Sequence, residues 1–465
     1  MNRKLQYIYN LFIAMIVSAL AVSCTDDELV KGGDKYEVVP DIPVALSLKI
    51  KVADQMEVQT RLAQSDETER TVNKLFVIAF KPSKQSDGAE NADASDDEWS
   101  VDNSAFYDTE DGLGNPIEVG KPQSVEFSMT TGLRRIYVVG NPQSGVGTLS
   151  DDELKNVKTI AALKALYSKL SDNLSVERVY FLMTGQAITK EKSEIVTVYK
   201  SGDHQGAIRE DYTMALNHVD ARITFNIIPA VGVTFEPEAY RVINIPGGTY
   251  LFSREKQNSG DNTWDYDGAG YAPSNRLSDF TEKDGKSIFE FYICENRQNP
   301  KQKISTESLL EEGTYYALRE KQEKKLITGT VEGQKYENGE YVYANAKSTY
   351  VELEGTITYK DDDGSEVYAK TTYTIHLGNT GNSNTADWLN DLELVNNYDT
   401  ERNTHYTYNV KVQSVDQIIV EVEDSKEVNP GAEGDVIVAQ GTVKTMDSHY
   451  GRLLLTLRKE DIPGR

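Results

Sequence analysis

VALSLKIKV, residues 44–52, alternates between apolar and polar side chains without interruption. Its apolar members share one face of an extended chain and are Val44, Leu46, Leu48, Ile50 and Val52. A period of two residues is typical of a strand that buries one face and exposes the other. The sequence therefore predicts a half-buried β-strand here, at the start of the first folded domain.

Strand-like patterns recur along the rest of the chain. They predict strands at 72–80, 133–139, 215–227, 287–294, 349–359, 367–377, 404–413 and 418–422. Residues 81–120 are polar and are predicted to form a long solvated excursion. One helix is predicted, from a capping box at Ser150 and Glu153 to about Leu170. The fold class is therefore all-β with one helix, as two β-sandwiches in tandem.

The same patterns predict the domain boundaries. We expect a first domain at 42–214 and a second at 215–423, where an alternating strand pattern restarts. A C-terminal tail, 424–465, follows, because Asn429-Pro430-Gly431 interrupts the strand pattern. The residues leave open whether the tail is complete or truncated.

The N-terminal residues predict export. An apolar run at 11–22 follows Arg3 and Lys4 and is shorter than the ~20 residues that span a bilayer. It ends in Leu20-Ala21-Val22-Ser23-Cys24, which resembles the bacterial lipobox, whose cysteine is acylated. We therefore expect a signal peptide at 1–23, lipid on Cys24 and a tether at 24–41. A plain secretory peptide is the alternative.

The acidic run after the cysteine indicates a location. Thr25-Asp26-Asp27-Glu28 resembles the surface-export signal of Bacteroidales lipoproteins. The expected place is then the cell surface, on the outer membrane. An ordinary acidic linker is the alternative.

Composition excludes some partners. The chain of 465 residues has a net charge of −25, which argues against nucleic acid and anionic membrane surfaces. With Cys24 acylated, Cys294 has no cysteine left to pair with, and its strand-like surroundings predict a small buried hydrophobe.

Catalytic and metal-binding patterns are missing from the sequence. It has no Gly-rich phosphate loop, no His-Glu-x-x-His and no nucleophile elbow. The five histidines are scattered, and the acidic turn Lys360–Ser365 lacks the ligand spacing of a calcium loop. We expect no enzyme, cofactor or metal site, although two distant carboxylates of a glycosidase would leave no motif.

Several short segments, in order along the chain, together resemble the fimbrillin superfamily, the type V pilus proteins of Bacteroidales. They are the lipobox with its acidic follower, Thr60-Arg61 before LFVIAF (75–80), the strand 216–227, FYICENR (291–297) and ERNTHYTYNV (401–410). The matches span most of the chain.

The resemblance implies a fold and a mode of assembly. It implies two transthyretin-like β-sandwich domains and an arginine-specific surface protease that cuts after the first strand. The groove left behind accepts a strand from the next subunit. Carried onto this chain, the cleavage residue is Arg61, with Arg70 second, and the strand removed is 44–52. An ordinary exposed loop arginine is the alternative for Arg61.

The function implied is that of a tip or accessory subunit of a fimbrium, active in adhesion and biofilm formation. Its partners would be other fimbrial subunits, the protease, the outer membrane through lipid, and a ligand on a host or bacterial surface. One alternative is a fimbrial anchor that keeps its lipid. Another is a glycan-binding lipoprotein of a polysaccharide-uptake system, with an aromatic platform drawn from Trp99, Trp264, Tyr266 and Tyr271.

Overall fold

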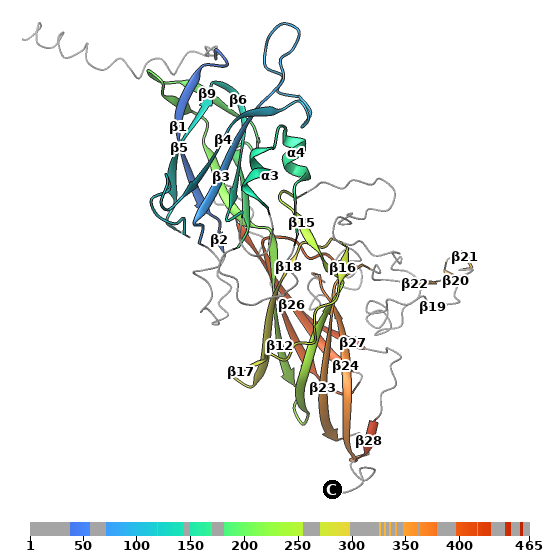
Figure 1. Ribbon diagram of the computed structural model, residues 1–465. Coiled ribbons are helices and arrows are strands. Elements are labelled where there is room, and N and C mark those ends of the chain that lie inside the picture. Colours follow the sequence, from blue (N-terminus) through green and yellow to red (C-terminus); the bar gives the residue numbers. More distant parts are fainter. Residues whose placement is uncertain are drawn as a thin grey trace, which may run out of the picture. The chain divides into compact units, whose positions relative to one another are not determined.

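The computed structural model describes most of both predicted domains (Figure 1). The described residues are 38–55, 71–118, 120–142, 149–169, 181–253, 270–297, 347–360, 363–378, 397–415 and 417–428, with short strands at 325–326, 330–331, 334–335, 340–341, 442–447 and 456–458. The regular secondary structure of the described residues is nearly all strand, with two short helices. The predicted all-β fold class is confirmed.

One hydrogen-bonded set of nine strands lies in the first half of the chain. Its order is β10-β9-β6-β8-β11-β1-β5, and β3 pairs with both β4 and β6. The bounds are β1 Pro43–Val52, β3 Lys74–Lys81, β4 Ser100–Asp108, β5 Gln123–Thr130, β6 Gly132–Gly140, β8 Met183–Thr189, β9 Val196–Lys200, β10 Gly206–Ile208 and β11 Tyr212–His218.

Strand β3 is buried on both faces, and this burial explains its unbroken apolar sequence. Leu75, Val77 and Ala79 join one core cluster with the inward side chains of β1 and β5. Phe76 and Ile78 join a second cluster with Trp99 and the helices α3 (Asp151–Lys155) and α4 (Ile160–Ala165). A strand covered on both sides reads as a continuous hydrophobic run.

Two further sheets are formed mainly by strands after residue 219, and β2, which follows β1 in the sequence, joins one of them by pairing with β26. One has the order β17-β18-β12-β25-β26-β2, with β27 on β26, and the other has the order β13-β23-β24-β28. Their bounds are β2 Asp54–Gln55, β12 Asp220–Pro229, β13 Thr234–Ile243, β17 Thr281–Lys283, β18 Lys286–Cys294, β23 Tyr350–Lys360, β24 Glu366–His376, β25 Thr404–Val412, β26 Gln417–Val428, β27 Thr442–Asp447 and β28 Thr456–Arg458.

Both of these sheets contribute to one core, as in a β-sandwich. Phe225 stacks between Phe289 and Tyr408 at centroid distances of 4.8 and 4.7 Å. The ring centroid of Tyr240, from the other sheet, lies 3.9 Å from that of Phe289. Stacked aromatic rings of this kind add specific contacts to the burial of apolar area.

Small strand pairs complete the described structure. They are β7 (Tyr167–Lys169) with β15 (Gly248–Tyr250), β14 (Ile245–Pro246) with β16 (Tyr271–Ala272), β19 (Lys325–Leu326) with β22 (Glu340–Tyr341), and β20 (Thr330–Val331) with β21 (Gln334–Lys335).

The prediction of one long helix to Leu170 is wrong. The capping box is present, with Ser150 Oγ accepting from the Glu153 amide at 3.2 Å, but α3 ends at Lys155. A second helix, α4, begins after Thr159, whose hydroxyl accepts from the Ala162 amide. A threonine that caps a helix in this way cannot also continue the preceding one, because its backbone is extended.

The prediction that 81–120 is a solvated excursion is also wrong. It contains β4, which pairs with β3, and Trp99, whose indole is buried and donates to the Ala94 carbonyl at 3.1 Å. The side chains of β4 are mostly half-buried, so the strand shows no alternation between apolar and polar residues.

Two strands cross the positions at which domain boundaries were expected. β11 pairs with β1 and β8 of the first strand set, although the sequence assigned 215–227 to the second domain. β26 runs through 423 to Val428 and pairs with β27, which lies in the predicted tail. The domain limits themselves stay predictions.

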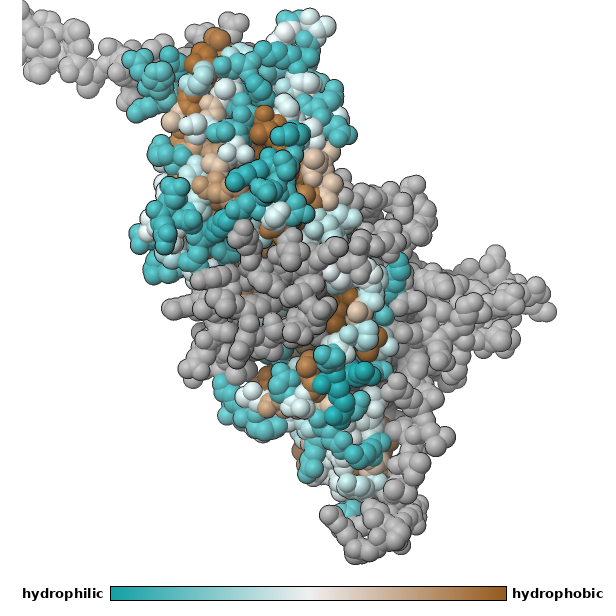
Figure 2. All heavy atoms as spheres, viewed as in Figure 1, coloured by the Kyte–Doolittle hydropathy of each residue, from teal (hydrophilic) through white to brown (hydrophobic). Residues whose placement is uncertain are grey.

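The surface of the described residues is largely polar. Figure 2 shows hydrophilic residues over much of the face in view, with hydrophobic residues in separate small patches. Among the described residues, the exposed large hydrophobic side chains are Val39, Val231 and Tyr368. None of the described helices is long and apolar enough to cross a membrane.

Candidate functional site

Strand β1 lies inside its sheet, between two neighbours. It pairs antiparallel with β5 from Pro43 opposite Thr130 to Ile50 opposite Gln123. Its other edge bonds to separate partners: the Ala45 amide donates to the His204 carbonyl at 2.8 Å, and the last residues run parallel to β11. The first strand of the chain is therefore an internal strand, hydrogen-bonded on both edges.

The five predicted apolar side chains of β1 all point into the core. Leu48, Ile50 and Val52 are 0% exposed, and Val44 and Leu46 are 4% exposed. They share a core cluster with Val125, Phe127 and Met129 of β5. Removal of these side chains would leave part of this core cluster uncovered.

A glycine lets the neighbouring strand approach β1 closely. A Cβ on Gly206 of β10 would lie 2.7 Å from Val44 Cγ2 and 3.1 Å from two atoms of Leu46. Real Cβ atoms do not approach carbon so closely, so a side chain here would displace β1. Farther along the same edge of β1, burial raises the pKa of Tyr212 in β11, and a hydrogen bond with the Lys49 backbone opposes that rise.

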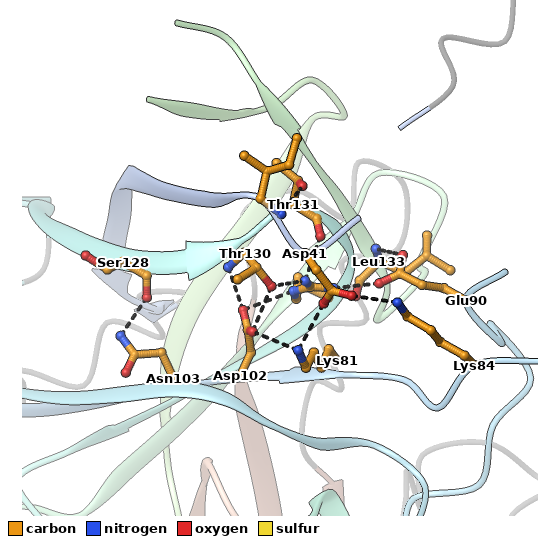
Figure 3. A network of polar contacts seen from close by, with 12 residues as sticks. Asp41, Lys81, Lys84, Glu90, Asp102, Asn103, Ser128, Thr130, Thr131 and Leu133 are labelled. Atoms are coloured by element: carbon orange, nitrogen blue, oxygen red, sulfur yellow. Dashed lines mark hydrogen bonds and ion pairs between the residues drawn. The ribbon is translucent and has the colours of Figure 1, made fainter. Parts of the chain in front are cut away.

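The start of β1 is held by a cluster of charged side chains, which we call the clasp: Asp41, Lys81, Lys84, Glu90, Asp102 and Arg134. Figure 3 shows Asp41 beside Lys81 and Lys84, with Glu90 and Asp102 nearby. Asp41 has a φ of 67°, and its carboxylate contacts Lys81 Nζ at 2.9 Å and Lys84 Nζ at 2.7 Å. The backbone at Asp41 and Ile42 also exchanges hydrogen bonds with Thr131.

Arg134 is the fully buried cation of the clasp. Its side chain is 0% exposed, with Nη1 donating to Glu90 at 2.9 Å and Nε donating to Asp102 at 3.2 Å. Asp102 also accepts from the amide and the hydroxyl of Thr130 (Figure 3). A buried guanidinium needs such partners, because an unpaired buried charge is strongly destabilising.

The electrostatics favour the ionised form of Asp41. Hydrogen bonds from Lys84 and then Lys81 lower the pKa of Asp41 to about 2, against an opposing effect of burial. The carboxylate is therefore ionised at neutral pH and pairs with both lysines. The clasp joins Asp41, two residues before β1, to β3 and to the loop after β3.

The other predicted site residues fall into two groups. Cys24, Arg61, Arg70, Trp264 and Tyr266 lie outside the described residues. Of the remaining aromatic candidates, Trp99 is wrong as part of an exposed platform because it is a core residue, and Tyr271 is half-buried in β16.

The remaining side chains singled out in the sequence are structural where they are described. Cys294 is buried and has no disulfide, as predicted. In the acidic turn, Asp363 accepts from the Ser365 amide at 2.8 Å, and its two preceding aspartates are outside the described residues. No group of three metal-ligating side chains occurs among the described residues.

The clasp is not among the features predicted from the sequence, although the sequence contains one signal for it. In the run at 133–139, Arg134 occupies the same face as Ile136 and Val138, which are buried. A charged side chain on the buried face of a strand predicts a buried ion pair. Its partners lie 32 and 44 residues away in sequence, so the pattern alone does not identify them.

One family model matches part of the chain. The family model of the major fimbrial subunit protein (FimA) matches residues 44–222. The match begins at Val44 of β1 and ends in β12. No curated protein matches the chain.

Solved structures with a similar arrangement include two from Porphyromonas gingivalis. The C-terminally truncated tip fimbrial protein Mfa3 has 13% identity and a TM-score of 0.44, covering 87% of this chain and 100% of that one. The fimbrial anchor protein Mfa2 has 10% identity and a TM-score of 0.31, covering 82% and 97%.

Proposed function

We propose that this chain, whose residues 44–222 belong to the fimbrillin superfamily, is a tip or accessory subunit of a surface fimbrium assembled by exchange of its first strand. The fimbrial role is structural and adhesive, at the cell surface, and the chain is not an enzyme. The proposed details are export as a lipoprotein through Cys24, cleavage by an arginine-specific surface protease, and adhesion in biofilms.

The observation that carries the proposal is the position of β1. It is internal and buried, yet it is the first strand of the chain, and Arg61 and Arg70 both follow it before β3 begins at Lys74. A cut at Arg61 would leave β1 as part of a separate peptide. Loss of that peptide would expose the inward side of β5 and the backbone groups that β1 now pairs on both edges.

The energetics explain why cleavage is needed. Each buried side chain of β1 contributes roughly 1.5–3 kcal/mol, and ordering the strand costs about 1–2 kcal/mol per residue. The net free energy that keeps β1 in the sheet is therefore modest. While β1 stays attached, however, it competes at an effective concentration on the order of mM, which an incoming strand seldom reaches.

A strand from another subunit then replaces what was lost. Addition of a strand to a sheet supplies backbone hydrogen bonds, and alternate side chains fill the pockets. The partners proposed for this site are other fimbrial subunits, and the subunit keeps its lipid until the cut. A cut at Arg61 separates the body from Cys24 and its lipid.

The test is a substitution that keeps the charge but removes the recognised residue. The double variant Arg61→Lys/Arg70→Lys should remain intact, lipid-anchored and monomeric, whereas the wild type is cut and assembles. Arg209→Lys, at an exposed residue outside this segment, is the matched control and should behave as the wild type. Assembly of the uncut double variant would contradict the proposal and favour the anchor role.

A further inference from the structure

We propose that the strand replacing β1 must carry a carboxylate where Asp41 now lies, and that Lys81 and Lys84 select partner strands by it. The inference rests on the proposed exchange of β1. The expected occupant is a strand of another fimbrial subunit with an aspartate or glutamate at its start.

The positive and negative side chains of the clasp are equal in number only while the segment that carries Asp41 and β1 is in place. Its cations are Lys81, Lys84 and Arg134, and its anions are Asp41, Glu90 and Asp102. Arg134 is paired with the two buried anions, whereas Asp41 is shared by the two lysines. Asp41 precedes Arg61, so the cut that frees β1 also removes this anion.

The lysines that lose Asp41 are accessible to a new partner. The side chains of Lys81 and Lys84 are 35% and 52% exposed. Asp102 lies 3.8 Å from Lys81 but already accepts from Arg134 and Thr130. The emptied groove would therefore end in a local excess of positive charge, on a chain whose net charge is −25.

The spacing between Asp41 and the inward side chains of β1 determines the position of the acidic residue in the incoming strand. Asp41 precedes Val44, the first inward apolar side chain, by three residues. A strand entering in the direction of β1 thus needs its acid three positions before its first groove-filling residue. Charge complementarity of this kind sets register and excludes wrong partners more than it adds affinity.

The experiment uses the full chain, an arginine-specific protease and labelled peptides of residues 38–53. Three peptides are compared: the natural one, Asp41→Asn, and Lys49→Gln as the matched control, because Lys49 is exposed on the outward face. Each is added in excess during cleavage, and its incorporation is measured by native electrophoresis and fluorescence anisotropy. The same series is run on the Lys81→Gln/Lys84→Gln chain, after near-UV circular dichroism has confirmed its fold.

The natural peptide should bind the cut wild-type chain roughly three- to tenfold more tightly than the Asp41→Asn peptide, since the ion pairs are partly exposed. The control peptide should match the natural one, and the preference should disappear on the double-lysine variant. Equal incorporation of natural and Asp41→Asn peptides would overturn the inference but leave strand exchange intact. If no peptide enters the cut chain, the exchange itself is refuted and the inference falls with it.

Discussion

Truncating Leu48 to alanine tests how the groove holds its first strand. Leu48 is fully buried and lies opposite Val125 in the register of β1 with β5. A buried leucine truncated to alanine costs ~2–5 kcal/mol, and ~1.4 kcal/mol corresponds to a factor of ten. Because the side chain belongs to the strand that leaves, a loss of ~3 kcal/mol should weaken the binding of the cut fragment roughly a hundredfold.

The assay follows the fragment after cleavage. A chain beginning at Thr25 is labelled at its N-terminus and cut with an arginine-specific protease, and the dissociation rate of the labelled fragment is read from fluorescence anisotropy. Most effects of such substitutions appear in the dissociation rate. Mass spectrometry confirms that the body is otherwise intact.

The matched control is Ser47→Ala, at the neighbouring position of the same strand. Ser47 is exposed and faces away from the core, so its substitution should change stability by no more than ~0.5 kcal/mol, or about twofold in rate. Equal dissociation rates for the Leu48→Ala and wild-type fragments would refute the claim that the inward face of β1 holds the strand.

Three further outcomes are expected. Gly206→Ala should cost ~1–3 kcal/mol in the free energy of unfolding, measured by urea denaturation, because its Cβ would overlap the side chains of β1. The pKa of Asp41 is lowered from 3.8 to about 2, so its stabilising effect is complete above pH 3.8 and is lost as the pH falls through about 2. The difference in unfolding midpoint between wild type and Asp41→Asn should therefore shrink from pH 5 to pH 2, and an unchanged difference would rule out the ion pairs as its cause. Cys24→Ala should abolish palmitate labelling and membrane retention, and normal labelling would disprove lipidation at this residue.

The sequence predicts the part of the site that depends on patterns among neighbouring residues. The alternation in 44–52 reports directly on which side chains face the core, because neighbouring residues of a strand point to opposite faces. The unbroken run of β3 likewise follows from burial on both faces. Both features depend on residues next to one another in the chain.

The clasp consists of residues far apart in the sequence, and local patterns do not predict such contacts. Asp41 meets Lys81 forty residues later, and Arg134 meets Glu90 forty-four residues earlier. These pairs form only because β1, β3, β5 and β6 meet at one end of the strand set. The edge-strand character of β4 and the break between α3 and α4 were missed for a related reason: half-buried side chains and a capping threonine leave no periodic signal.

The proposed assembly requires that β1 is removed from the subunit. Mass spectrometry of the N-terminal peptide of subunits from purified surface filaments tests it most directly. Assembled subunits are expected to begin at Leu62, or at Thr71 if Arg70 is the residue cut. Assembled subunits that begin at acylated Cys24 and still contain VALSLKIKV would contradict it.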